Sequence, residues 1–234
     1  MKRNRLLLLA GAVGVAAAIA VVLIVVIGTG SSSSPTTTAS TGEASAPTGA
    51  PAGLPQHGDT LGKPSAPAKL IVYEDPQCPF CRRWNIETLP TVLRDFVRPG
   101  RLALVYRGVV IIGPNSVRGL RAIYAAGEQN KLWNMVDALY ARQGAENSGW
   151  ITKSVILEAA QAAGVHGKAL LARMSSPAVT AALTRAAKQA AADHVPGTPT
   201  FIVQRPPPAL AQQLAVTSLD PASFVGSLSA ALQQ

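Results

Sequence analysis

Two cysteines three residues apart are the feature of this sequence that most clearly indicates chemistry. They are the only cysteines among the 234 residues, and they form the motif Cys78-Pro79-Phe80-Cys81. In thiol–disulfide exchange a thiolate attacks a disulfide sulfur, and a second thiol nearby can resolve the mixed disulfide that forms. The motif therefore predicts redox exchange, with Cys78 as the nucleophile and Cys81 as the resolving thiol.

The residues around the motif predict a strand before it and a helix after it. Residues 69–75 read Lys-Leu-Ile-Val-Tyr-Glu-Asp, which is typical of a strand, and apolar residues recur at helical spacing after Arg82. Cys78 then lies at a helix N-terminus, where unpaired N–H groups and the positive end of the helix dipole favour a thiolate. Pro79 suits the first helical position because its missing N–H would lack a partner there. This layout is typical of a thioredoxin-type redox site.

A Cys-x-x-Cys motif also has three other interpretations. A structural zinc site needs four ligands, but the chain has no second cysteine pair and its histidines are scattered, at His57, His166 and His194. Attachment of c-type haem needs a His directly after the second cysteine, where Arg82 stands. A purely structural disulfide around so short a loop would add little stability. The sequence thus favours the redox interpretation, with no metal site.

The first 58 residues predict a membrane anchor and a linker. Residues 1–5 carry three basic side chains, and residues 6–27 form an uncharged apolar run, which as a helix is about 33 Å long and spans a bilayer core. The basic flank predicts a cytoplasmic tail, with the rest of the chain outside. A cleaved signal peptide is the alternative. Residues 28–58, mostly Gly, Ser, Thr, Ala and Pro, predict a disordered linker with a reach of about 30 Å.

The remaining residues, 59–234, predict one α/β domain with a central mixed sheet. A second buried strand is expected over residues 101–107, and an alanine-rich helical block extends from about 116 to 193. The helices expected within this block are 116–128, 131–142, 152–163 and 177–193. Towards the C-terminus, the pattern predicts a strand over 214–217 and a last helix over 221–232.

The net charge of +9 limits the kinds of partner. The basic residues are spread along the chain, without the basic stripe or the interleaved aromatic residues of nucleic-acid-binding proteins. The charge is therefore compatible with solubility or with attraction to anionic lipid head groups, and no nucleic acid is expected as a partner.

Four features together resemble one known family. They are the segment 73–82 around the motif, the helical block 116–193, the segment Gly-Thr-Pro-Thr-Phe at 197–201, and the membrane anchor. On these features, residues 59–234 resemble a DsbA-type thiol–disulfide oxidoreductase. The resemblance implies a thioredoxin fold with an inserted α-helical subdomain at about 116–193, preceded here by an N-terminal transmembrane helix.

The resemblance also implies roles for individual residues. In this family the proline that corresponds to Pro199 is cis and faces the two cysteines, so Pro199 is expected to shape a groove for an extended substrate segment. Thr198 is expected to pair with the backbone of that segment and to touch the reactive sulfur. Pro79 and Phe80 are expected to belong to the same motif and groove.

Two positions depart from the family pattern. Many thioredoxin-fold enzymes carry a buried acid six residues before the first cysteine, which exchanges a proton with the second; this chain has Val72 there. Glu74 or Asp75 is a candidate substitute, with water or a merely solvated loop position as alternatives. Thr198 before the proline resembles the isomerase branch more than the strongest oxidases. Arg82, one helical turn after the first cysteine, is a further candidate for tuning the thiolate through its charge.

The sequence therefore predicts a membrane-anchored, extracytoplasmic oxidoreductase that introduces disulfides into exported proteins. The resemblance implies exported cysteine-containing proteins as substrates and a quinone-linked thiol oxidase in the membrane as redox partner. No cofactor is expected. Two alternatives stay open: an isomerase or reductase that acts on exported thiols, and a chaperone or assembly factor that uses the same groove without redox chemistry.

Overall fold

The structure is a computed structural model that describes residues 46–205 and 210–233. The predicted anchor, residues 6–27, and residues 28–45 of the predicted linker lie outside these ranges. Among the described residues, none of the helices has both the length and the apolar character that a membrane span requires.

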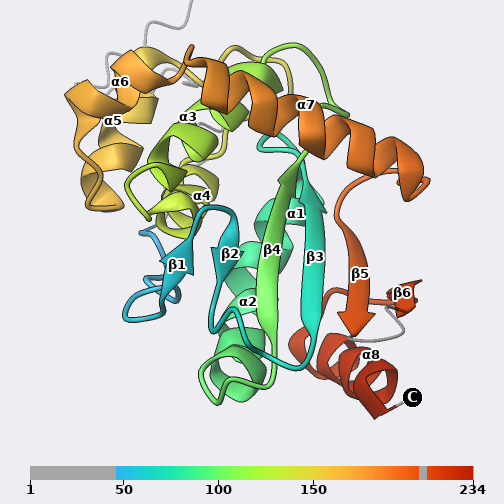
Figure 1. Ribbon diagram of the computed structural model, residues 1–234. Coiled ribbons are helices and arrows are strands. Elements are labelled where there is room, and N and C mark those ends of the chain that lie inside the picture. Colours follow the sequence, from blue (N-terminus) through green and yellow to red (C-terminus); the bar gives the residue numbers. More distant parts are fainter. Residues whose placement is uncertain (1–45, 206–209, 234) are drawn as a thin grey trace, which may run out of the picture. The chain divides into compact units, whose positions relative to one another are not determined.

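A mixed sheet forms the centre of the domain (Figure 1), and the described residues contribute six strands in the order β1-β2-β4-β3-β5-β6. The central pair, β3 (Lys69–Glu74) and β4 (Ala103–Gly108), is parallel, and β5 (Thr200–Arg205) runs antiparallel to β3. The remaining strands are short and lie toward the edges: β1 (Gln56–His57), β2 (Thr60–Leu61) and β6 (Leu210–Gln213). Because β3 pairs through six residues with β4 and through five with β5, the redox motif follows the most extensively paired strand.

Helices cover both faces of this sheet. On one face Leu70 and Val72 of β3 are fully buried in the main hydrophobic core, together with the helix that follows the motif. On the opposite face Tyr73 packs in a smaller cluster against Ala190 of α7 (Pro177–Ala192). Successive side chains of a strand point to opposite faces, so a strand covered on both sides is apolar at nearly every position.

The helix after the motif is continuous in backbone conformation from residue 79 to residue 97, but its winding changes. It consists of α1 (Pro79–Arg83), the π-helical turn η1 (Trp84–Thr88), α2 (Leu89–Val92) and a second π-helical turn η2 (Leu93–Val97). Pro90 lies in the first turn of α2, directly after a π-helical turn. Because a π-helical turn shifts the hydrogen-bond register by one residue, the chain passes Pro90 without ending the helix.

The predicted helical block between β4 and β5 is present and contains one helix more than expected. The four expected helices are α3 (Ser116–Gly127), α4 (Leu132–Tyr140), α5 (Lys153–Ala162) and α7, with ends within two residues of the prediction. The additional helix is α6 (Gly167–Arg173), which begins after His166. The sequence does not indicate it because it is short and starts with a glycine, a poor helix former.

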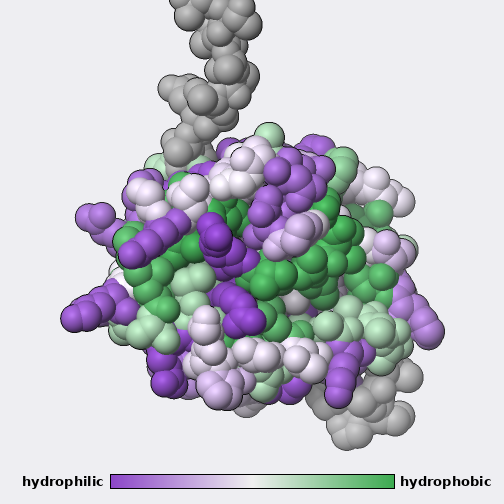
Figure 2. All heavy atoms as spheres, turned by 90° about the horizontal axis from the view of Figure 1, so that it is seen from above, coloured by the Kyte–Doolittle hydropathy of each residue, from purple (hydrophilic) through white to green (hydrophobic). Residues whose placement is uncertain are grey.

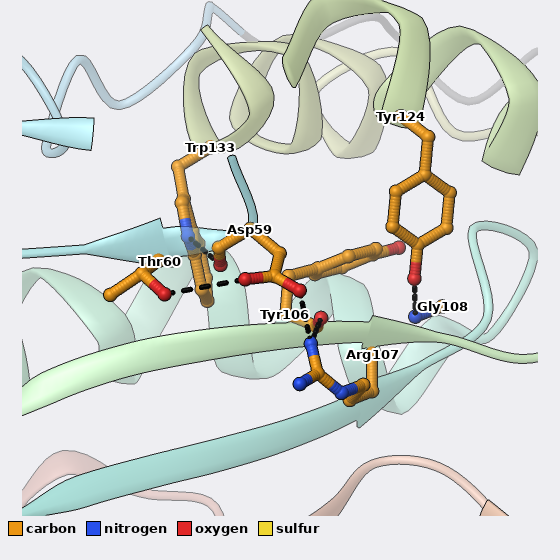
Figure 3. A network of polar contacts seen from close by, with 7 residues as sticks. All are labelled: Asp59, Thr60, Tyr106, Arg107, Gly108, Tyr124 and Trp133. Atoms are coloured by element: carbon orange, nitrogen blue, oxygen red, sulfur yellow. Dashed lines mark hydrogen bonds and ion pairs between the residues drawn. The ribbon is translucent and has the colours of Figure 1, made fainter. Parts of the chain in front are cut away.

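A polar network attaches this helical block to the sheet (Figure 3). Asp59, just before β2, forms an ion pair with Arg107 of β4, and the indole N–H of Trp133 donates to the Asp59 carbonyl oxygen at 3.1 Å. The Tyr124 hydroxyl accepts a hydrogen bond from the Gly108 N–H at 2.9 Å. These contacts fix α3 and α4 above the end of β4, next to the redox motif.

The linker prediction is wrong for residues 46–58, because this part folds with the domain. It contains β1, and the buried carboxylate of Asp137 in α4 accepts hydrogen bonds from the N–H and the hydroxyl of Thr48 and from the N–H of Gly49, at 2.8–2.9 Å. The composition of the segment does not indicate that it folds, because the carboxylate that binds it, Asp137, lies almost 90 residues further along the chain.

The strand predicted over residues 214–217 is also wrong. The edge strand β6 ends at Gln213, and beyond it only the N–H of Leu214 still bonds to β5, donating to the Phe201 carbonyl at 2.8 Å. The Leu214 side chain is buried in the main core. The apolar residues that predicted a strand here therefore belong to a loop, in which Leu214 is buried against the core. The last helix, α8 (Pro221–Gln233), lies where it was predicted.

Phe224 should be the residue that holds α8 to the core. It is fully buried, and its ring centre lies 4.8 Å from that of Phe201 and 6.0 Å from that of Trp84. Phe224→Ala is expected to lower the free energy of unfolding by about 3–5 kcal/mol through the cavity it leaves. Phe80→Ala, at a site that is 60% exposed, is the matched control and should change it by less than about 0.5 kcal/mol. Urea denaturation measures both, and equal effects would contradict the assignment.

Candidate active site

Cys78 is the N-cap residue of α1, as the sequence predicted. Its backbone is extended (φ −72°, ψ 119°), and its sulfur accepts a hydrogen bond from the N–H of Cys81 at 3.4 Å. Pro79 occupies the first helical position. The sulfur therefore lies at the positive end of the helix, where a negative charge is stabilised.

The two cysteines, which are buried free thiols in this structure, differ in acidity. Cys78 is 3% exposed and Cys81 is fully buried. The pKa of Cys78 is lowered to about 6, chiefly by its hydrogen bond with the Cys81 side chain; burial opposes this effect and hydrogen bonding by Thr198 adds to it. Burial raises the pKa of Cys81 well above its ordinary value, and the nearby charge of Glu74 raises it further. At neutral pH the pair therefore consists of one thiolate and one thiol.

The segment before β5 lies directly against the reactive sulfur. The Thr198–Pro199 peptide bond is cis, and the Cys78 thiol donates to the Thr198 carbonyl oxygen at 3.2 Å. This places Thr198 at the sulfur, as the family resemblance implied.

Two hollows meet at this segment. One, of about 360 Å³, is lined by residues that include Phe80 and Arg83 of α1 and residues 217–219. The other, of about 510 Å³, runs along the start of β5 and residues 213–216. Thr198 and Pro199 line both hollows. The surface beside the redox motif is thus hollowed at the segment that carries Thr198 and Pro199.

Glu74 places a buried acid on the same face of the sheet as Val72. Both residues lie on β3 two positions apart, so their side chains point to the same face of the sheet. Glu74 is fully buried, and the amide Nδ2 of Asn85 donates to its Oε1 at 2.6 Å and to the Cys81 carbonyl at 2.9 Å. Burial raises the pKa of Glu74 well above its ordinary value, and the charge of Cys78 acts in the same direction.

The other two candidates for tuning the thiolate have different surroundings. Arg82 donates from Nε to the Tyr140 carbonyl at 3.1 Å, at the end of α4. The Asp75 carboxylate is fully buried and accepts hydrogen bonds from two backbone loops and from Ser116. An effect of either charge on the thiolate stays a prediction.

The loop that carries Cys78 is also held by residues that sequence analysis missed. Gln143 Nε2 donates to the carbonyls of Pro76 and Cys78 at 2.9 and 3.0 Å, and the Tyr140 hydroxyl donates to the Asp75 carbonyl at 3.0 Å. No local spacing links these residues to the motif, because they lie beyond β4 and α3. Of the residues that sequence analysis missed, only Asn85 could have been found from its spacing, because it follows Cys81 by one helical turn.

Comparison with known proteins agrees with this geometry. The family model described as thioredoxin matches residues 56–206, more than half of the chain. The probable disulfide bond formation protein D of Bacillus cereus is 32% identical over 100 residues, which make up 42% of this chain and 46% of that protein. The match thus spans about half the length of this curated relative.

Solved structures show the same fold. Oxidised BdbD from Bacillus subtilis superposes with a TM-score of 0.63 at 17% identity, over 82% of this chain and 98% of that one. A thioredoxin-like oxidoreductase from Silicibacter pomeroyi gives a TM-score of 0.57 at 27% identity, over 75% of this chain and 92% of that one. The chain belongs to the thioredoxin family, and it shares its fold with these solved structures.

The Cys78 thiolate can be titrated directly. In the reduced protein, thiolate absorbance at 240 nm should rise with a midpoint near pH 6 and should be absent from Cys78→Ser in this pH range. Cys81→Ala should move the midpoint upward, because it removes the hydrogen-bonding thiol. A wild-type midpoint at the ordinary value of about 8.5 would contradict the assignment.

Proposed function

We propose that this protein oxidises pairs of thiols in exported proteins and so introduces disulfides into them. The observation that carries the proposal is the Cys78 sulfur, held at a helix N-terminus with a pKa of about 6. A thiolate that is stable in the reduced protein favours the reduced state, which makes the Cys78–Cys81 disulfide a stronger oxidant.

The proposed reaction balances over two exchanges. A substrate thiolate attacks the Cys78 sulfur of the disulfide, and the Cys81 sulfur leaves and takes up a proton. A second substrate thiolate then attacks the substrate sulfur of the mixed disulfide, and Cys78 leaves as a thiolate. The substrate loses two electrons and gains a disulfide, while the cysteine pair is reduced. A quinone-linked thiol oxidase in the membrane would then accept these electrons.

The groove beside Pro199 supports a polypeptide as substrate. Its hollows run to both sides of the segment that contacts the Cys78 sulfur. An extended segment could pair with the backbone at Thr198 while its own cysteine approaches Cys78. This arrangement gives affinity through the backbone, so it accepts many sequences.

Glu74 is proposed to exchange the proton of Cys81. Asn85 bonds to both the Glu74 carboxyl and the Cys81 carbonyl, which keeps the acid close to the resolving cysteine. Because burial raises the pKa of Glu74, the carboxyl can hold a proton near neutral pH and return it when the Cys81 sulfur leaves.

We further propose that the domain works outside the cytoplasmic membrane, anchored by residues 6–27. The basic residues before the apolar run support this orientation. The length of the linker, residues 28–45, would keep the active site near the membrane and near a membrane-bound electron acceptor. Exported proteins would then meet it as they emerge.

A second candidate is a disulfide isomerase or a reductase of exported thiols. Thr198 before the cis proline favours it, because this residue resembles that branch of the family. A chaperone without redox chemistry is disfavoured, since binding alone has no need for a thiolate and a thiol held in contact.

Replacing either cysteine should separate the two exchanges. Cys78→Ser is expected to reduce oxidation of a reduced, unfolded protein to the background rate, because the attacked sulfur is gone. Cys81→Ser has no disulfide to donate, but its Cys78 thiolate should attack a substrate that already carries a disulfide and accumulate as a mixed disulfide, visible on a non-reducing gel. Full turnover by Cys78→Ser would refute the proposed function, and activity of the double variant in cells would favour the chaperone.

Glu74→Gln should slow only the step that involves Cys81. When oxidised glutathione is mixed with the reduced protein, Cys78 attacks first and Cys81 then closes the disulfide. The second step should slow by on the order of 10²-fold without the buried base, while the first keeps its rate. Stopped-flow tryptophan fluorescence resolves the two. Glu87→Gln, half exposed on the helix that begins at the redox motif, is the control, and an equal slowing in both variants would exclude the proton-transfer role.

A further inference from the structure

A hollow of about 440 Å³, the α7 hollow, lies between β4 and α7. Arg107 of β4 lines it and pairs in register with Tyr73 of β3, so both side chains lie on the face of the sheet that α7 covers, opposite the redox helix. The small side chains of Ala182 and Ala186 line it from α7 and leave the space open. Figure 2 views the side of the molecule on which α7 lies in Figure 1, and strongly hydrophilic side chains project among hydrophobic ones there. The described residues that line this hollow include none from the redox motif or from the groove at Pro199.

The charged side chains around the α7 hollow are mostly positive. Three basic residues line it, Arg107, Arg185 and Lys188, against one acidic residue, Asp59. Asp59 forms an ion pair with Arg107. In the part of the chain that the structure describes, neither Arg185 nor Lys188 forms an ion pair. The hollow therefore has an excess of two positive charges.

Two other acidic side chains nearby are held by partners of their own. Asp193, which follows α7, accepts hydrogen bonds from the Tyr73 hydroxyl at 2.5 Å and from the side-chain amide of Gln189 at 2.9 Å. Glu128, which lines an adjoining hollow of about 390 Å³, forms an ion pair with Arg173. These carboxylates leave the excess positive charge of the α7 hollow in place.

The α7 hollow also contains hydrogen-bond donors that lack an acceptor among the described residues. Tyr124 of α3 lines both hollows and is only 7% exposed. Its hydroxyl oxygen accepts the Gly108 N–H (Figure 3), which leaves its own O–H to donate. Burial raises the pKa of Tyr124 to about 12, so the hydroxyl keeps this proton at neutral pH. Arg107 bonds through Nη1 to Asp59 and to the Tyr106 carbonyl, which leaves Nε and Nη2 as donors.

We propose that the α7 hollow binds a phosphate group, carried either by free phosphate or by the head group of an anionic lipid. The donors come from β4, α3 and α7, and a tetrahedral phosphate has oxygen atoms that can meet donors from several directions. A planar carboxylate would need only one guanidinium fork. The inference goes beyond the proposed function and does not depend on it, because the site is separate from the cysteines.

The test measures the Kd of the full-length protein by calorimetry for two probes. One is inorganic phosphate, and the other is glycerophosphoglycerol, the head group of phosphatidylglycerol without its acyl chains. Arg185→Gln/Lys188→Gln should raise the Kd at least about tenfold, because both variants remove a charged hydrogen-bond donor. Tyr124→Phe, which removes only the hydroxyl, should raise it by a smaller factor. Arg94→Gln/Lys153→Gln removes the same two charges at exposed positions elsewhere and should leave the Kd unchanged.

The two probes distinguish the source of the phosphate. Binding of the diester at least as tight as that of inorganic phosphate would assign the site to a lipid head group, and weaker binding of the diester would assign it to free phosphate. The proposal is wrong if neither probe binds at millimolar concentrations, or if the two double variants weaken binding equally. Loss of binding in Cys78→Ser would also overturn it, because the anion would then lie at the start of α1. None of these titrations involves thiol exchange, so their failure leaves the proposed oxidation of thiols untouched.

Discussion

The active site depends on one interaction, the stabilisation of the Cys78 sulfur at the start of α1. The sulfur takes the place of an N-capping oxygen and accepts the N–H of Cys81, and hydrogen bonding by the Cys81 side chain lowers its pKa most. Because burial alone would raise the pKa of this thiol, the hydrogen bonds must outweigh it. That requires β3, α1 and the start of β5 to meet within hydrogen-bonding distance, which the central position of β3 makes possible.

Two neighbouring carboxylates at the end of β3 serve different purposes. Glu74 points toward the cysteines, where burial and the thiolate charge keep its pKa high. Asp75 accepts four hydrogen bonds from groups beyond the strand. The sequence offers these residues as equivalent substitutes for the acid missing at Val72. Strand geometry distinguishes the two residues, because side chains two positions apart lie on the same face of a sheet. Glu74 therefore lies on the face of Val72, and Asp75 does not.

The features predicted correctly from the sequence are those with local causes. The Cys-x-x-Cys spacing, the proline after Cys78 and the apolar run of β3 each act over a few residues, so the strand, the redox helix and most of the helical block follow from them. The features that were missed depend on distant partners. Residues 46–58 are held by Asp137, and the redox loop by Tyr140 and Gln143. The roles of Asp137, Tyr140 and Gln143 can be recognised only when the packing of α4 next to the motif is known.

The reduction potential of the Cys78–Cys81 pair, measured against glutathione buffers, tests the central claim most directly. Reference couples run from about −120 mV for a strong oxidant, through about −180 mV for an isomerase, to about −270 mV for thioredoxin. Because the reduced form is stabilised through the Cys78 thiolate, we expect a value between the first two and closer to the oxidant. A value near −270 mV would contradict the account, since electrons would then flow from this protein to its substrates.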